Sequence, residues 1–239
     1  MHTDQPVIWG IVPAAGIGLR MMADRPKQYL DLAGSPVIKH SIDALFSLNR
    51  IQGVVVSIAA ADQWWPEVEF DDHKAEKILV VEGGKERSDS VLNALNLLAD
   101  KASDDDWVLV HDAARPCLRG DDLEDMVGKL WNHPVGGILA SPLADTIKRS
   151  GTNREIVETV DRSGLWRALT PQMFRLGMLR SALRQSMEDG VSVTDDSQAI
   201  EYLGFQPEII EGDAGNMKIT HPGDILLAEE IMQRERGKS

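Results

Sequence analysis

Two basic side chains follow a glycine-rich turn near the start of the chain, at offsets that suit phosphate binding. Residues 13–18 read Pro-Ala-Ala-Gly-Ile-Gly and come directly after an apolar run at 7–12, and Arg20 and Lys27 follow them. Small residues let backbone N–H groups approach a phosphate closely. Because the chain has a formal net charge of −13, two cations beside such a turn predict a local anion site rather than a generally basic surface.

The turn differs from two familiar phosphate-binding motifs. No Gly-Lys-Ser/Thr triplet follows its glycines, so it is not a P-loop. The third glycine of the dinucleotide fingerprint is missing, and Arg20 stands near its place. The alternative is an ordinary strand-to-helix turn with solvated Arg and Lys side chains, and the ordered continuation Pro26-Lys27-Gln28 argues against it.

Composition limits the classes of protein to which the chain can belong. Its 239 residues are 43% hydrophobic, which is enough for a sizeable core in one α/β domain. The acidic balance argues against a nucleic-acid partner, because phosphate-backbone binding needs a basic face. The single cysteine, Cys117, excludes an intramolecular disulfide and fits a reducing compartment. We expect a cytoplasmic protein, since neither a signal peptide nor a run of 18 apolar residues is visible.

Apolar runs alternate with helical patterns along the first 140 residues. The pattern predicts strands at 7–12, 53–59, 78–81, 107–110 and 136–140, and helices from about 36, at 88–99 and at 121–131. Such alternation predicts an α/β fold with a Rossmann-like, mainly parallel sheet and helices on both faces. Ligands of these sheets bind at the carboxyl ends of the strands, where the glycine-rich turn, Gly84 and Asp112 are all predicted to lie.

Residues 145–161 break this alternation. Two short β-rich runs, 145–149 and 155–161, flank a polar turn that contains a glycine, which predicts a hairpin. An isolated hairpin is marginal in water. The hairpin therefore needs a partner, either the rest of the domain or another subunit.

Six motifs together resemble one enzyme family. The segment 13–30 is similar to the signature of nucleotidyltransferases that join a nucleoside triphosphate to a sugar or polyol phosphate. Five further motifs follow in the order of the 2-C-methyl-D-erythritol 4-phosphate cytidylyltransferase family: GGKERSDSV at 83–91, VHDAARP at 110–116, LTPQMF at 169–174, VTDD at 193–196 and NMKIT at 216–220. The resemblance covers nearly the whole chain, and several motifs in order are far more specific than any one alone.

The resemblance implies a reaction and an assembly. A cytidylyl group would pass from CTP to 2-C-methyl-D-erythritol 4-phosphate, giving 4-diphosphocytidyl-2-C-methyl-D-erythritol and pyrophosphate, in isoprenoid precursor biosynthesis by the non-mevalonate pathway. It also implies a single nucleotidyltransferase domain over 1–239, of the nucleotide-diphospho-sugar transferase type. A dimerisation arm at about 141–168 would cross to the partner of a homodimer.

The substrate phosphate is already an oxyanion, so the protein needs no nucleophile and must instead position two polyanions and neutralise growing charge. By resemblance, the catalytic side chains are Arg20, Lys27, Arg162 and Lys218. The nucleotide would contact Ala14, Ala15, Gly16, Gly18, Gly84, Ser90, Asp112 and Ala113. The polyol phosphate would contact Arg115, Thr146, Thr170 and Thr194. Arg162 and Thr146 lie on the arm and would act in the neighbouring subunit's site.

Other residues receive structural interpretations. Asp112 has the alternative role of capping the turn that follows it. Arg87 and Asp89 are interpreted as a structural pair in the first turn of a helix, and His111 and Cys117 as packed residues. Mg²⁺ is expected on the CTP phosphates, and no residue is named as its ligand, because Mg²⁺ commonly keeps its waters.

Two alternatives stay open from the motifs. A sister group with similar motifs uses ribitol 5-phosphate as the acceptor, and the first half of the chain does not separate the two. A nucleotide-binding regulatory subunit that keeps the fold without turnover is a hypothesis of another class. The loss of Arg20 or Lys27 would favour it, and both are present.

Overall fold

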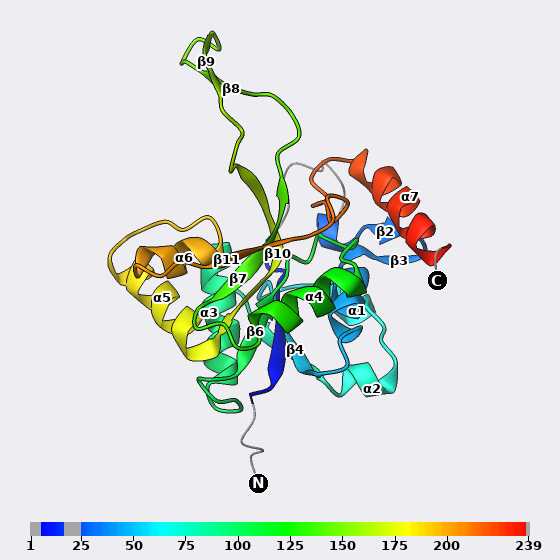
Figure 1. Cartoon of the computed structure of the whole chain (residues 1–239). Helices are drawn as coiled ribbons and strands as arrows, with labels where there is room; N and C mark the ends of the chain where they lie inside the picture. Colours follow the sequence, from blue (N-terminus) through cyan, green and yellow to red (C-terminus); the bar gives the residue numbers. More distant parts are fainter. Residues whose placement is uncertain (1–5, 17–24, 238–239) are drawn as a thin grey trace.

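A seven-stranded sheet forms the centre of the molecule (Figure 1), in a computed structural model that describes residues 6–16 and 25–237. The strand order is β11-β7-β10-β6-β1-β4-β5. The strands are β1 (Ile8–Pro13), β4 (Ile51–Ile58), β5 (Ile78–Glu82), β6 (Trp107–Val110), β7 (Gly136–Pro142), β10 (Trp166–Arg175) and β11 (Glu208–Glu211). Only β10 runs antiparallel to its neighbours β6 and β7, so the predicted mainly parallel sheet is confirmed.

Both faces of this sheet are covered by helices, as the continuous apolar runs of its inner strands require. Along β4, Val54 and Val56 pack into one core cluster while Val55 packs into the other. The first cluster includes side chains of α1 (Val37–Phe46) and α4 (Gly120–Leu130). The second includes α3 (Arg87–Leu98), α5 (Leu176–Glu188) and α6 (Asp196–Tyr202).

The remaining elements are small or peripheral. A two-stranded ribbon, β2 (Asp31–Leu32) and β3 (Ser35–Pro36), precedes α1, and α7 (Asp224–Arg236) lies beside it (Figure 1). Short helical turns occur at η2 (Lys27–Tyr29), η3 (Trp65–Glu67) and α2 (Asp72–Ala75). Among the described residues, no helix is both long and apolar enough to cross a membrane.

Most predicted element boundaries lie within two residues of the observed ones. Beyond the hairpin, none of the later elements was predicted from the sequence, among them β10, the strand that makes the sheet mixed. Pro171 interrupts its sequence pattern, and the pairing with β7 shifts register between Ala168 and Gln172. A proline has no N–H to give to a ladder, so it is accommodated where the register breaks.

The predicted hairpin is present and projects away from the sheet (Figure 1). Its strands are β8 (Ile147–Ser150) and β9 (Ile156–Val160), which pair antiparallel. Ile156 and Val157 are 67% and 62% exposed on this arm. The hairpin therefore presents apolar side chains to solvent in the single chain.

Candidate active site

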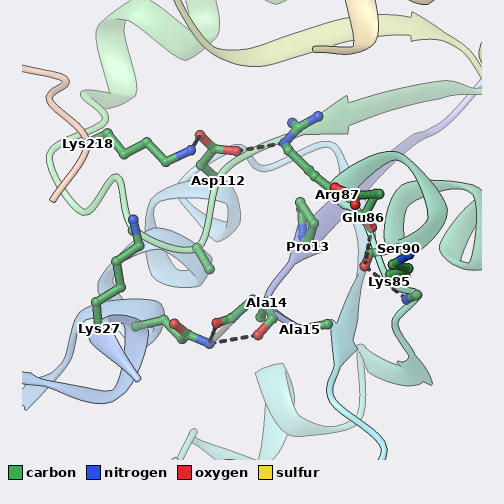
Figure 2. A pocket seen from close by; sticks show the side chains of 15 residues that line it. Pro13, Ala14, Ala15, Lys27, Lys85, Glu86, Arg87, Ser90, Asp112 and Lys218 are labelled. Carbon is green, nitrogen blue, oxygen red and sulfur yellow. Dashed lines mark hydrogen bonds and ion pairs between the residues drawn. The ribbon is translucent and has the colours of Figure 1, made fainter. Parts of the chain in front are cut away.

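An open pocket lies at the carboxyl edge of the sheet, beside the ends of β1 and β6 and the turn after β5 (Figure 2). Its lining consists of Pro13, Ala14, Ala15, Gly16, Lys27, Gln28, Gly84, Lys85, Glu86, Arg87, Ser90, Asp112, Ala113, Ala114 and Lys218. Segments far apart in the sequence thus meet where a parallel α/β sheet is expected to bind ligands.

The first wall of the pocket is the start of the glycine-rich turn. The Ala14 N–H donates to Ser57 O at 2.7 Å, which continues the β1–β4 pairing past the end of β1. The side-chain amide of Gln28 donates to Ala14 O at 2.7 Å and to Gly16 O at 3.0 Å. The turn is therefore fixed from two sides as far as it is described.

The second wall is the turn at 83–84, which packs directly against the first. The buried Ser90 hydroxyl accepts from Gly84 N at 3.1 Å and donates to Glu86 O at 3.1 Å. A Cβ added to Gly83 would lie 2.4 Å from the Cβ of Ala15. Only glycine allows the two walls to approach so closely.

Asp112 lies on the floor of the pocket, between cations from different segments. Figure 2 shows Arg87 and Lys218 on opposite sides of it. Arg87 Nε donates to Asp112 Oδ1 at 3.0 Å, and Lys218 Nζ and Arg115 Nε lie 2.8 Å and 3.5 Å from Oδ2. Burial by itself would raise the pKa of Asp112, but Arg87, Lys218 and Arg115 outweigh it and hold the pKa well below its usual range.

Arg87 also joins the pocket to α6. Its Nη2 donates at 2.8 Å to Oδ2 of Asp196, which is fully buried. The predicted pairing of Arg87 with Asp89 is wrong. Asp89 instead accepts from Glu86 N at 2.9 Å in a capping box at the start of α3.

The C-terminal segment runs along the rim of the pocket. Arg115 Nη1 donates to Asn216 O at 2.7 Å, and Ile219 N donates to Ala114 O at 2.8 Å. Lys27 Nζ in turn donates to Ile219 O at 2.9 Å. These bonds place the ammonium groups of Lys27 and Lys218 on the same rim, as Figure 2 shows.

Comparison with known proteins identifies the family of the chain that forms this pocket. Residues 8–234 match the family described as 2-C-methyl-D-erythritol 4-phosphate cytidylyltransferase. The chain belongs to this family. A protein of that name from Pseudomonas entomophila is 51% identical over 239 residues, covering 100% of each chain. Its namesake from Hahella chejuensis is 49% identical over 227 residues, covering 95% of this chain and 93% of the relative.

Solved structures agree with this assignment. A crystal structure of a 4-diphosphocytidyl-2C-methyl-D-erythritol synthase is 34% identical, with a TM-score of 0.82, and covers 96% of this chain and 100% of its own. The 2-C-methyl-D-erythritol 4-phosphate cytidylyltransferase of Francisella tularensis is also 34% identical, with a TM-score of 0.81, and covers 94% of this chain and 99% of its own. The predicted fold class is confirmed by these matches.

The predicted site residues fall into several groups by their position in the structure. Of the predicted catalytic and nucleotide-binding residues, nine line the pocket: Ala14, Ala15, Gly16, Lys27, Gly84, Ser90, Asp112, Ala113 and Lys218. Arg20 and Gly18 lie outside the described residues, so their roles stay predictions.

Two predicted substrate contacts lie behind the pocket rather than in its lining. Arg115 is directed at Asn216 and Asp112. The buried Thr170 accepts from Asp112 N at 3.1 Å and lies 2.9 Å from His111 Nδ1. In this chain Thr170 therefore holds the backbone of Asp112.

The other three predicted residues lie apart from the pocket. Thr146 and Arg162 are exposed at the base of the arm, where Arg162 donates to Ala144 O. Thr194 N donates to Gln198 Oε1 at 2.6 Å, beside a shallow hollow that Leu165 and Trp166 also line. None of these three side chains is among the described residues that line the pocket.

His111 is structural, as the sequence predicts. Its Nε2 lies 2.9 Å from Arg115 O, which can only accept, so Nε2 carries the proton and Nδ1 accepts from the Thr170 hydroxyl. Burial lowers the pKa of His111 to about 4. The imidazole is therefore neutral at pH 7 and fixes the turn that follows β6.

Sequence reasoning assigned no role in the site to Gln28, Arg87 or Asp196. Each lies inside a recognised motif, which was the available signal. Gln28 donates to main-chain oxygens of another segment, and Arg87 donates to the carboxylates of Asp112 and Asp196. Spacing along one segment does not reveal such partners.

Proposed function

We propose that the pocket binds CTP and that the chain transfers its cytidylyl group to 2-C-methyl-D-erythritol 4-phosphate, releasing pyrophosphate. The observation that carries the proposal is the convergence of Lys27 and Lys218 with small-residue walls in a chain of this family. The family match also favours methylerythritol phosphate over ribitol 5-phosphate, since both curated relatives described above carry the first name.

The reaction is an in-line exchange at phosphorus. An oxygen of the acceptor phosphate forms a bond to the α-phosphorus of CTP, and the bond from that phosphorus to the bridging oxygen of pyrophosphate breaks. Negative charge grows on the transferred group and on the leaving pyrophosphate. Lys27, with Arg20, stabilises this charge, and Lys218 orients the acceptor phosphate.

The pocket suits a pyrimidine nucleotide. Its walls include Ala14, Ala15, Gly16 and Gly84, whose side chains are small or absent, so backbone groups of the turns can meet the base and ribose. Asp112, held ionised by its cations, lies beside Lys218 and balances its charge until the phosphates bind.

Mg²⁺ is expected to arrive with the triphosphate. Of the described residues that line the pocket, Glu86 and Asp112 carry carboxylates, and both oxygens of Asp112 already face cations. The described residues contain no group of three or more His, Cys, Asp or Glu side chains arranged for a metal. This donor set fits a metal held mainly by phosphate oxygens and water. When bound, the metal would neutralise charge on the phosphates.

The complete site is proposed to need two chains. Arg162 and Thr146 lie at the base of the arm, away from Lys27 of the same chain, and the arm exposes Ile156 and Val157. A homodimer through the arm would bury these side chains and bring Arg162 and Thr146 to the partner's acceptor site. We place the enzyme in the cytoplasm, where a single reduced cysteine is stable.

The test is pyrophosphate release from each of CTP, UTP, ATP and GTP, with a panel of polyol phosphates. We expect turnover with CTP and methylerythritol phosphate, and far less with the purine nucleotides or with ribitol 5-phosphate. Comparable turnover with ATP would contradict the pyrimidine site. Faster turnover with ribitol 5-phosphate would reassign the acceptor.

A further inference from the structure

We infer that Gln28 is a positioning residue for the nucleotide: its side-chain amide holds the glycine-rich turn in the form that receives the triphosphate of CTP. The inference rests on the proposed function of the pocket. It assigns to Gln28 no contact with the reacting atoms.

The geometry of the Gln28 amide is unambiguous. Its nitrogen lies 2.7 Å from Ala14 O and 3.0 Å from Gly16 O. Both partners are carbonyl oxygens, which only accept, so the NH₂ group must face them and both of its hydrogens are used. The residue is only 4% exposed, so water does not readily replace these bonds.

The hydrogen bond from Gln28 to Ala14 O sets the direction of the peptide group between Ala14 and Ala15. A trans peptide is planar, so the N–H of one residue points opposite to the preceding C=O. Because Ala14 O points at Gln28, the N–H of Ala15 points away from it. Among the described residues that N–H has no acceptor, which leaves it available to an anion in the pocket.

The backbone around Gln28 is itself anchored in several directions. Gln28 is the middle residue of η2, a 3-10 helix with three residues per turn, so consecutive side chains point about 120° apart. Lys27 Nζ reaches Ile219 O at 2.9 Å, and the hydroxyl of Tyr29 donates to Asp62 at 2.8 Å. One turn of helix thus fixes the C-terminal rim, the glycine-rich turn and the segment after β4 relative to each other.

The test is the equilibrium binding of CTP, CMP and cytidine to wild type and to Gln28→Met, which keeps the length of the side chain and removes both donors. We expect the Kd for CTP to rise by at least about tenfold and the Kd for cytidine to change less than twofold. Gln185→Met is the matched control, because the side-chain amide of Gln185 donates its hydrogen bond to Asp189 on the exposed surface of α5.

A pH profile separates positioning from simple destabilisation. In Gln28→Glu a carboxylate would face two carbonyl oxygens, and protonation would restore one O–H donor. We therefore expect the affinity of this variant for CTP to recover, relative to wild type, as the pH falls from 8 to 6. Tyr29→Phe removes only the outer anchor and should weaken CTP binding in the same direction by a smaller factor, which keeps the test available if the Gln28 variants unfold.

Two results would overturn the inference: equal weakening of CTP and cytidine binding in Gln28→Met, or unchanged CTP binding in a folded Gln28→Met. A wild-type chain that binds CTP no better than cytidine would instead refute the phosphate site of the proposed function, and the inference with it.

Discussion

At the scale of single residues, the main feature of the pocket is that its charged side chains are held in place before any substrate binds. Asp112 lies within 3.5 Å of nitrogen atoms of Arg87, Lys218 and Arg115. These cations come from three different segments, so one carboxylate fixes all of them. Positive charge is thereby oriented in advance, which is how an active site stabilises a transition state without reorganising.

Replacing Lys27 by Ala is expected to lower kcat by roughly 10²-fold or more, with a much smaller effect on the Kd for CTP. The reason is that the ammonium group acts on charge that grows during the reaction. Steady-state rates and equilibrium CTP binding measure the two effects. Lys129→Ala is the control, because Lys129 pairs with Asp125 on the exposed side of α4. A raised KM with unchanged kcat would assign Lys27 to ground-state binding.

His111 predicts a pH dependence of stability. Its pKa in the folded chain is about 4, below the ordinary value of 6.5, so between these values the unfolded chain binds a proton that the folded chain does not. The contribution of His111 to the free energy of unfolding should be fully present above pH 6.5. The free energy of unfolding should fall by about 3 kcal/mol as the pH drops to 4.

Urea unfolding at several pH values measures this slope, and His111→Gln, which keeps a donor for Arg115 O, should flatten it. A slope that is the same in His111→Gln would show that another group is responsible. Asp112 contributes in a different window, because its lowered pKa makes its stabilisation disappear only at more acid pH.

At the scale of elements, the width of the pocket is set by two turns rather than by the strands that deliver them. The turn after β1 and the turn after β5 touch through Ala15 and Gly83. The Ser90 hydroxyl, at the first turns of α3, holds the second turn in place. These two contacts therefore set how far apart the two turns lie.

Gly83→Ala is expected to separate the turns, because the new Cβ would lie 2.4 Å from Ala15 Cβ and 2.9 Å from Ser90 Oγ. We expect a loss of stability of about 1–3 kcal/mol and a fall in kcat/KM for CTP. Thermal unfolding and steady-state rates measure both.

Gly128→Ala is the matched control, since a Cβ there meets nothing within 4 Å on the exposed side of α4. It should leave kcat/KM unchanged and stabilise the helix slightly. Equal kcat/KM in Gly83→Ala and wild type would show that the contact between the turns is not needed for catalysis.

At the scale of the whole molecule, one predicted site residue, Arg162, lies apart from the pocket in the single chain. The pocket gathers Lys27, Lys218 and Asp112, while Arg162 lies at the base of an arm that leaves the sheet (Figure 1). An arm with exposed apolar side chains is stable when a second copy covers it. The proposed homodimer accounts for both observations.

Mixing Arg162→Ala with Lys27→Ala, under conditions of subunit exchange, tests the shared site. If Arg162 serves the partner's pocket, each heterodimer has one site with both lesions and one intact site, and activity should recover toward half of the wild-type value. The mixture of Lys27→Ala with Lys218→Ala should not recover, because both lysines line the same chain's pocket. If exchange is proven and the first mixture stays inactive, each chain supplies its own Arg162.

The sequence alone determined the sheet strands and the longer helices of the first 140 residues, and the hairpin. Buried strands such as β4 and β6 are continuous apolar runs, so the local pattern was sufficient to predict them. The motif order was specific enough to indicate the family that the comparisons show. The later elements α5, α6, α7, β10 and β11 were missed, and in β10 the strand pattern is interrupted by Pro171 at a register shift.

Only the tertiary structure decided which side chains pair. Arg87 and Asp89 are close in sequence, yet residues two apart on a helix point to different sides, and Arg87 instead bonds Asp112 and Asp196 at 3.0 and 2.8 Å. The side-chain amide of Gln28 donates hydrogen bonds to carbonyl oxygens of a turn more than ten residues earlier. These partners are set by how distant segments pack at one sheet edge. Spacing along the sequence indicates which residues belong to a motif. The directions of their side chains depend on the packing of the whole fold.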